Sequence, residues 1–184
     1  MSFGVRLKAR LVTLTLAAPI IVATGAAGVA QQANDCAVIS RLAGSWTGRG
    51  NLQRTASADP EPVRCRLSFD WRPSSRIMSS TMECRGIDLD FKLWGSVSVV
   101  APGDKLKGAF FGSEGVTNVN ANGQCRPAAL VLRLKENNPK PGTPVSSDLT
   151  IALSDDGGTL TNLLETRDPD TGRKWQTMSI SFKR

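Results

Sequence analysis

The sequence contains no histidine and no tyrosine, and only 5% of its 184 residues are aromatic. Without histidine, the chain cannot form a Ser-His-Asp or Cys-His catalytic arrangement, and no metal ion can have a histidine ligand. Its four cysteines are too widely spaced for the paired C-x2-C ligands of a zinc site. We therefore expect no metal, no cofactor and no enzyme activity.

Residues 1–30 have the pattern of a secretory signal peptide. Three basic residues precede a short apolar run, residues 11–22, and Gly28 and Ala30 occupy the −3 and −1 positions of a cleavage site. The run is shorter than the roughly 20 residues of a membrane span. We expect cleavage after Ala30, a periplasmic or secreted protein without a transmembrane segment in the mature chain, and one domain over residues 31–184.

The mature chain is only moderately basic and lacks a run of basic residues. The leader carries three of the 23 Lys and Arg, so the formal net charge falls from +7 to +4 on its removal. Nucleic-acid binding needs a clustered basic face and often stacking aromatics, so we expect no nucleic-acid partner. Arg64 and Arg66 could form an anion-binding patch with Arg85, although such arginines more often pair across strands with acids such as Asp88.

Acidic residues offer little chemistry. Asp88 and Asp90 alternate with apolar residues, which predicts the solvated face of a strand rather than an acid/base pair. Residues 155–158 form an Asp-Asp-Gly-Gly segment that is too short for a calcium loop and is typical of a hairpin turn.

Alternation of apolar and polar residues predicts an all-β chain. The clearest segment is 63–71, where every second residue is apolar, and turn signals such as Asn122-Gly123 separate the segments. A short helical turn is expected within residues 34–42, with Asp35 as its cap. The spacing predicts an antiparallel sandwich or barrel of eight to ten strands. The other alternating segments are 87–99, 130–134, 149–153 and 178–182, and in weaker form 45–54, 76–85, 105–112 and 159–167.

The segment Leu42-Ala43-Gly44-Ser45-Trp46 stands where the first strand is expected to begin. A Gly-x-Trp at this place resembles the calycins, which include lipocalins, avidins and small bacterial metalloprotease inhibitors. The Leu-Ala-Gly-x-Trp-x-Gly-x-Gly start and Arg64-Cys65-Arg66 also resemble a group of uncharacterised exported rhizobial proteins. The resemblance implies a calycin-like, up-and-down barrel in which Trp46 plugs one end. It also implies that a basic residue at the end of the last strand, Arg184 or Lys183, packs over that ring.

All four cysteines lie in the mature part, and an even number in an exported chain favours disulfides. Four cysteines allow three pairings. Cys65 and Cys84 lie on the apolar faces of two successive strands, and a turn centred near residues 74–75 places them opposite each other. This register favours a Cys65–Cys84 bridge, which leaves Cys36 to pair with Cys125.

Two functions fit this sequence. The first is an exported, non-enzymatic binding protein of the cell envelope whose barrel holds a small apolar ligand. The second is an interaction module, in its sharpest form an inhibitor of an exported protease, with residues 31–39 in the protease cleft. Cys36 weakens the second because a disulfide would tether that segment to the barrel.

Overall fold

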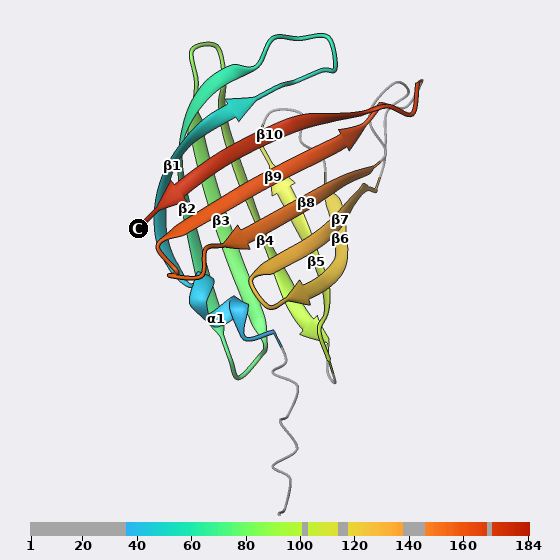
Figure 1. Ribbon diagram of the computed structural model, residues 1–184. Coiled ribbons are helices and arrows are strands. Elements are labelled where there is room, and N and C mark those ends of the chain that lie inside the picture. Colours follow the sequence, from blue (N-terminus) through green and yellow to red (C-terminus); the bar gives the residue numbers. More distant parts are fainter. Residues whose placement is uncertain (1–35, 101–102, 114–117, 138–145, 169–170) are drawn as a thin grey trace, which may run out of the picture. The chain divides into compact units, whose positions relative to one another are not determined.

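Ten antiparallel strands close into a barrel, in which each strand pairs with its neighbours in sequence and β1 pairs with β10 (Figure 1). The all-β, calycin-like, up-and-down barrel with a short N-terminal helix that the sequence predicts is thus confirmed. The strands are β1 (Gly44–Leu52), β2 (Glu61–Arg72), β3 (Ile77–Arg85), β4 (Asp90–Val100), β5 (Lys105–Gly112), β6 (Val119–Arg126), β7 (Ala129–Glu136), β8 (Ser146–Leu153), β9 (Thr159–Arg167) and β10 (Lys174–Lys183).

This computed structural model describes residues 36–100, 103–113, 118–137, 146–168 and 171–184. They belong to one compact unit, Gln31–Arg184. The expected signal peptide lies outside the described residues, so its cleavage after Ala30 stays a prediction.

Alternation in the sequence becomes an inner and an outer surface of the barrel. In β2, Val63, Cys65, Leu67 and Phe69 are buried, and the residues between them are exposed. The same alternation in the other strands fills the interior with apolar side chains, whose burial is the main contribution to the stability of such a fold. Polar side chains are left on the outer surface, where any charged group stays in contact with water.

The sequence-based prediction places Ile87 and Asp88 in a strand, and that part is wrong. The N–H of Gly86 donates to the carbonyl of Leu89, 2.6 Å away, and closes a turn before β4. Oε1 of Glu61 accepts the N–H groups of both Ile87 (2.7 Å) and Asp88 (2.9 Å). These bonds hold the turn outside the sheet, and Ile87 is 80% exposed.

The turn expected at Asn122-Gly123 is also absent, because both residues lie within β6. Gly123 pairs with Leu132 of β7. A Cβ at position 123 would lie 2.9 Å from the Cα of Leu132, so this glycine allows close packing between strands rather than a reversal of the chain. Cys125 therefore belongs to a strand and does not follow a turn.

Candidate functional site

A short helix, α1 (Val38–Leu42), covers one end of the barrel (Figure 1). Val38, Ile39 and Leu42 are buried beneath it. Its N-cap residue is Ala37, so the helix begins later than predicted, and Asp35 lies outside the described residues. Arg41 fastens the helix to the β8–β9 turn by donating to the carbonyl oxygens of Ser154 and Asp155. We call this end of the barrel the closed end.

Trp46 and Arg184 complete the closed end. The Trp46 side chain is 1% exposed, and its Nε1 donates to the carbonyl of Leu42 at 2.9 Å. The Arg184 guanidinium lies 4.6 Å from the centroid of the Trp46 ring and donates to the carbonyls of Arg41 and Ala43. The last carbonyls of a helix have no partner within it, so the two side chains satisfy groups that would otherwise be unpaired. Arg184 thus takes the predicted position, whereas Lys183 is exposed on the outer surface.

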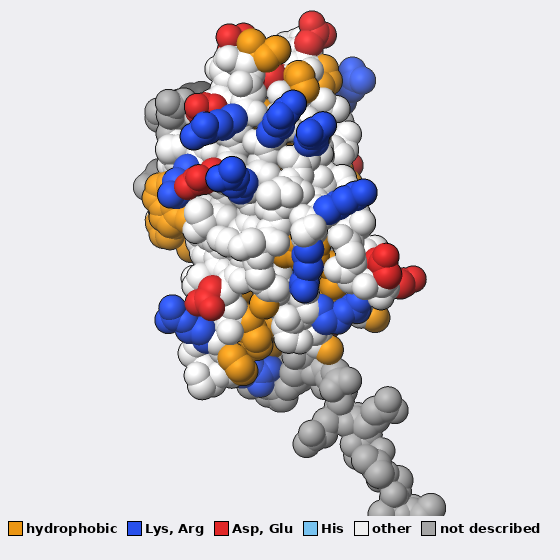
Figure 2. Space-filling view, turned by 90° about the vertical axis from the view of Figure 1, so that its left-hand side faces the viewer, with side chains coloured by type: hydrophobic (Ala, Val, Ile, Leu, Met, Phe, Trp, Pro, Cys, Tyr) orange, Lys and Arg blue, Asp and Glu red, His pale blue; other side chains and the backbone are white. Residues whose placement is uncertain are grey.

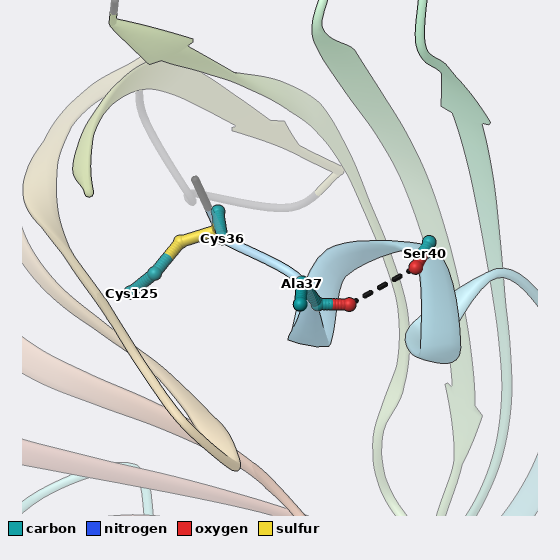
Figure 3. Close-up of a disulfide and its surroundings, with 4 residues drawn as sticks. All are labelled: Cys36, Ala37, Ser40 and Cys125. Carbon is teal, nitrogen blue, oxygen red and sulfur yellow. Dashed lines mark hydrogen bonds between the residues drawn. A yellow bond between two sulfur atoms is a disulfide. The ribbon is translucent and has the colours of Figure 1, made fainter. Parts of the chain in front are cut away.

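Both disulfides have the predicted pairing. Cys36 is bonded to Cys125, which joins the segment before α1 to β6 (Figure 3). Cys65 and Cys84 face each other in the β2–β3 register and are bonded across those two strands. The first disulfide therefore links the segment at the closed end to the barrel wall. The second links two adjacent strands on the inner side of the wall.

The opposite end of the barrel, which we call the open end, is less well covered. Partly buried apolar side chains pack against the core there, in strand segments that lead away from α1. An inward side chain that keeps partial exposure must border space that water can enter. These residues are Leu52, Phe91, Leu93, Val119, Leu134 and Leu164.

Polar groups interrupt the apolar interior near the open end. The Oγ1 of Thr166 lies 3.0 Å from the Ser147 hydroxyl and also bonds to Thr177. Asn162 is only 4% exposed, and its Oδ1 has no hydrogen-bond partner within the described residues. Nε1 of Trp175 is likewise buried without a partner among them. Buried polar atoms are normally satisfied, so an unpaired acceptor and an unpaired donor on β9 and β10 need an explanation.

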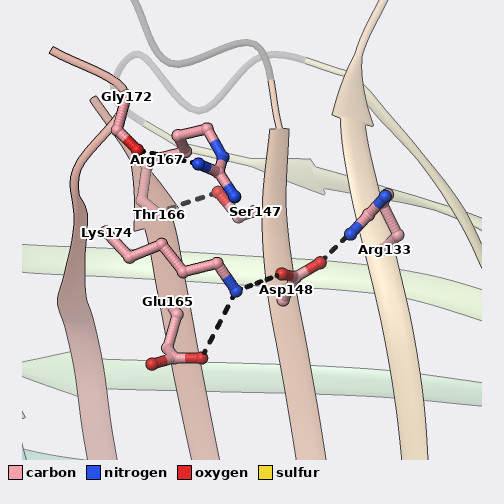
Figure 4. Close-up of polar contacts among 8 residues, drawn as sticks. All are labelled: Arg133, Ser147, Asp148, Glu165, Thr166, Arg167, Gly172 and Lys174. Atoms are coloured by element: carbon pink, nitrogen blue, oxygen red, sulfur yellow. Dashed lines mark hydrogen bonds and ion pairs between the residues drawn. The ribbon is translucent and has the colours of Figure 1, made fainter. Parts of the chain in front are cut away.

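An ionic network covers the outer face of the same strands (Figure 4). Asp148 lies 2.9 Å from Lys174 and 3.1 Å from Arg133, and Lys174 also lies 3.9 Å from Glu165. The hydrogen bond from Lys174, with that from Arg133, holds the pKa of Asp148 below its usual value despite partial burial of the carboxyl. The network braces β7, β8, β9 and β10 from outside without contacting the interior.

The arginines singled out in the sequence lie together on the outer surface. Arg64, Arg66 and Arg85 are exposed on β2 and β3, and none forms an ion pair within the described residues. Asp88 is not their partner within the described residues: its backbone N–H donates to Glu61, and its backbone carbonyl accepts from Arg54 at 2.8 Å. Acids nevertheless lie opposite two of the three arginines in the register, Glu83 opposite Arg66 and Asp90 opposite Arg85, whereas Arg64 has arginines on both sides.

Sequence reasoning missed Trp175 at the open end, Asn162 partway along β9, and Arg49 and Lys183 beside the arginines. Asn162 carries a detectable signal, since it is the polar residue between Leu160 and Leu164 on an apolar face. In the part of the chain that the structure describes, no three His, Cys, Asp or Glu side chains gather as metal ligands. None of the described helices is long and apolar enough to cross a membrane.

No protein-family model matches the sequence, and no curated protein is significantly similar to it. Solved structures do share the fold. Rv2717c from M. tuberculosis is 17% identical, with a TM-score of 0.64 over 83% of this chain and 98% of that chain. The S-type phycobiliprotein lyase CPES from Guillardia theta is 12% identical, with a TM-score of 0.51 over 79% of this chain and 88% of that chain. At these identities the likeness establishes the fold alone: this chain is a small antiparallel β-barrel.

Proposed function

We propose that this protein is an exported, non-enzymatic binding protein of the cell envelope, whose barrel holds a small and mostly apolar ligand at the open end. The observation that carries the proposal is the buried Oδ1 of Asn162, which has no partner among the described residues and lies on the inner face of the barrel wall. An apolar ligand with a hydrogen-bond donor would satisfy this acceptor.

The surroundings of Asn162 support this class of ligand. Its cross-strand neighbours are Ile180 and Ile151, and the next inward residue toward the open end is the partly buried Leu164. A ligand entering from the open end would therefore replace water along apolar walls and meet a polar anchor at depth. Binding sites of small molecules commonly combine an apolar lining with a few polar groups that fix orientation. Trp175 Nε1 offers a donor for a second polar group of the ligand.

The two fold neighbours support the barrel on which the proposal rests. One of them is described as a phycobiliprotein lyase, and its barrel resembles this one. No catalytic step is part of the proposal, since the chain has no histidine to act as a base. Export rests on the leader pattern in residues 1–30, and the two disulfides are consistent with an oxidising compartment. Kinship with the exported rhizobial proteins rests on the sequence motif alone.

Protease inhibition through the N-terminal segment has less support. Cys36 is bonded to Cys125, and Val38 and Ile39 are each 1% exposed. That half of the segment is therefore committed to the closed end and is out of reach of a protease cleft.

The proposal can be tested with N-phenyl-1-naphthylamine, a neutral apolar dye whose fluorescence rises in apolar surroundings, together with native mass spectrometry of protein purified from its own envelope. We expect dye binding, displacement of the dye by any co-purified ligand, and weaker binding of that ligand to Asn162→Leu. Asn122→Leu is the matched control, because Asn122 is exposed on the outer face of β6. If neither the unsubstituted protein nor Asn122→Leu binds the dye, and native mass spectrometry detects no co-purified ligand, the barrel does not have a ligand-binding interior.

A further inference from the structure

The outer surface of β10, β1, β2 and β3 carries five cations around a groove of about 1220 Å³. The five cations lie in two rows that run across the strands. Arg49, Arg64 and Arg85 lie directly opposite one another on β1, β2 and β3. Arg66 and Lys183 flank Thr47 in the neighbouring row. Figure 2 shows Lys and Arg side chains spread over the face that lies at the left of Figure 1, with a smaller number of acidic side chains among them and at the edges.

This arrangement costs stability unless an anion is present. Like charges placed directly opposite each other in a sheet repel, and Arg64 has an arginine opposite it on both sides. Within the described residues, none of the five cations forms an ion pair. The acid in the groove lining is Glu83, which lies opposite Arg66 in the register and is paired with Lys92 at 2.8 Å, and Asp90 of β4 lies opposite Arg85.

The charge of the face is that of the whole mature chain. The five cations and Glu83 sum to a formal +4, which equals the net charge of residues 31–184. The other charged residues of that segment therefore sum to a formal charge of zero. A groove lined by one sign of charge focuses the field and raises the local concentration of counter-ions.

Spacing and chemistry limit the ligand. Neighbouring strands lie about 4.8 Å apart and residues two apart in a strand about 7 Å, so the five Cα atoms, on four adjacent strands, fall within about 14 by 7 Å. A carboxylate brings one negative charge and a phosphoryl group about 1.5 to 2, so neutralising this area takes two or three linked phosphoryl groups. Guanidinium groups match phosphate oxygens in bidentate geometry.

From these observations, we propose that this groove binds a soluble anion that carries two or more linked phosphoryl groups. The floor of the groove includes the backbone of β1 at Gly48 and Gly50, and the arginine side chains form its walls. Exposed Ile87 stands at one edge and offers an apolar contact to whatever the phosphoryl groups are attached to. The site lies outside the barrel, so it does not depend on the interior ligand proposed above.

A nucleic acid or a membrane surface fits the groove less well. Its lining contains no aromatic side chain, whereas proteins that bind single-stranded nucleic acid stack bases on aromatic rings. Beyond Arg85, the turn that carries Ile87 also carries exposed Asp88, which an anionic bilayer would repel. These two classes of partner are therefore outcomes that would contradict the proposal.

The test is calorimetric titration of the purified, disulfide-bonded protein with inorganic tripolyphosphate at low salt, with backbone amide shifts recorded by NMR. We expect shifts confined to β10, β1, β2 and β3, and affinity that falls as salt is raised. Arg64→Gln should bind tripolyphosphate about tenfold more weakly, because it loses one charge-assisted hydrogen bond. Lys135→Gln is the control, since this exposed lysine on β7 is five strands from β2 in the closed ring.

Several results would overturn the assignment. Equal weakening by Arg64→Gln and Lys135→Gln would mean that only net charge matters. Citrate binding as tightly as tripolyphosphate would remove the preference for phosphoryl groups, and binding to phosphatidylglycerol vesicles or oligonucleotides but not to tripolyphosphate would indicate a different partner. Arg64 is exposed between like charges, so its replacement should not lower the melting temperature. If it does, Arg49→Gln provides the same test from the neighbouring strand.

Discussion

The two ends of the barrel are built from the same strands but are finished in different ways. At the closed end, α1, Trp46 and Arg184 bury one another and satisfy the helix carbonyls, and a disulfide holds them to β6. At the open end, inward apolar side chains keep partial exposure and Nε1 of Trp175 lacks a partner among the described residues, as does Oδ1 of Asn162 deeper in the barrel.

This difference suits a division of roles within one domain, with groups for stability at the closed end and groups for ligand binding toward the open end. Side chains at the closed end pack and pair with one another, as expected of groups selected for stability. Unpaired buried atoms lower stability, so their presence at the open end points to a role outside folding. Perturbations at the closed end should therefore unfold the protein, whereas those at the open end should change ligand binding at a smaller cost in stability.

The largest loss of stability is expected from the disulfides, and the two should differ. Replacing both Cys36 and Cys125 by Ala opens a loop with a sequence separation of 89, and replacing Cys65 and Cys84 opens one of 19. The chain-entropy relation gives losses of about 4–5 and about 3 kcal/mol, respectively. Urea unfolding of both double variants measures the difference. All four cysteines are buried, so cavity effects are similar in the two variants, and equal losses would contradict the greater importance of the closed-end bridge.

A second contrast compares two tryptophans. Trp46→Ala removes a fully buried ring and should lower the free energy of unfolding by about 3–5 kcal/mol. Trp175→Ala removes a partly exposed ring at the open end and should cost at most about 2 kcal/mol. Thermal and urea unfolding report both values. Arg184→Gln removes the cation over Trp46, worth about 0.5–2 kcal/mol, together with the hydrogen bonds to the carbonyls of Arg41 and Ala43. A loss equal to that of Trp46→Ala would mean that Arg184, not the ring, holds this end.

The smallest effect is a pH dependence at the open end. The N–H groups of Asp88 and Ile87, together with Arg54, hold the pKa of Glu61 below its usual value of 4.5. A lowered pKa means that this carboxylate stabilises the folded state above pH 4.5, and that the contribution is lost as the pH falls through the folded-state value. The turn carrying Ile87 should therefore loosen below about pH 4.5, seen as shifts of its amide resonances.

Glu61→Gln should loosen that turn already at neutral pH and remove its acid transition. Asp59→Asn, which changes an exposed carboxyl in the β1–β2 loop, is the control and should leave the transition in place. An unchanged transition in Glu61→Gln would assign it to another carboxyl group.

Local patterns in the sequence account for much of the fold. Alternation along 63–71 and 76–85, with a turn signal at Pro73, places Cys65 opposite Cys84, because one turn fixes the register of two adjacent strands. Asn122-Gly123 misled the same reasoning: the dipeptide is a common turn, but here the small residue makes room for Leu132. Which of these roles a glycine has depends on a neighbouring strand, and that information is not local.

The two candidate sites were harder to predict for the same reason. The basic face unites β1, β2 and β3 with Lys183 of β10, so it exists only once the barrel has closed. Arg64 and Arg66 were visible as a pair, but Arg49 and Lys183 lie in segments whose adjacency depends on the β1–β10 pairing. Ile87 was misplaced because the acceptor that holds its turn, Glu61, is 26 residues away.

Pairing of β1 with β10 also has a kinetic consequence. Thr47 lies opposite Lys183, so the seam of the barrel joins strands from opposite ends of the domain. Until β10 has formed, β1 and β9 are sheet edges with free backbone groups, and such edges recruit other chains. Contacts of this sequence separation form slowly because a long loop must first be closed. Pairing of β10 with β1 and β9 therefore ends the period in which these two edges can recruit other chains.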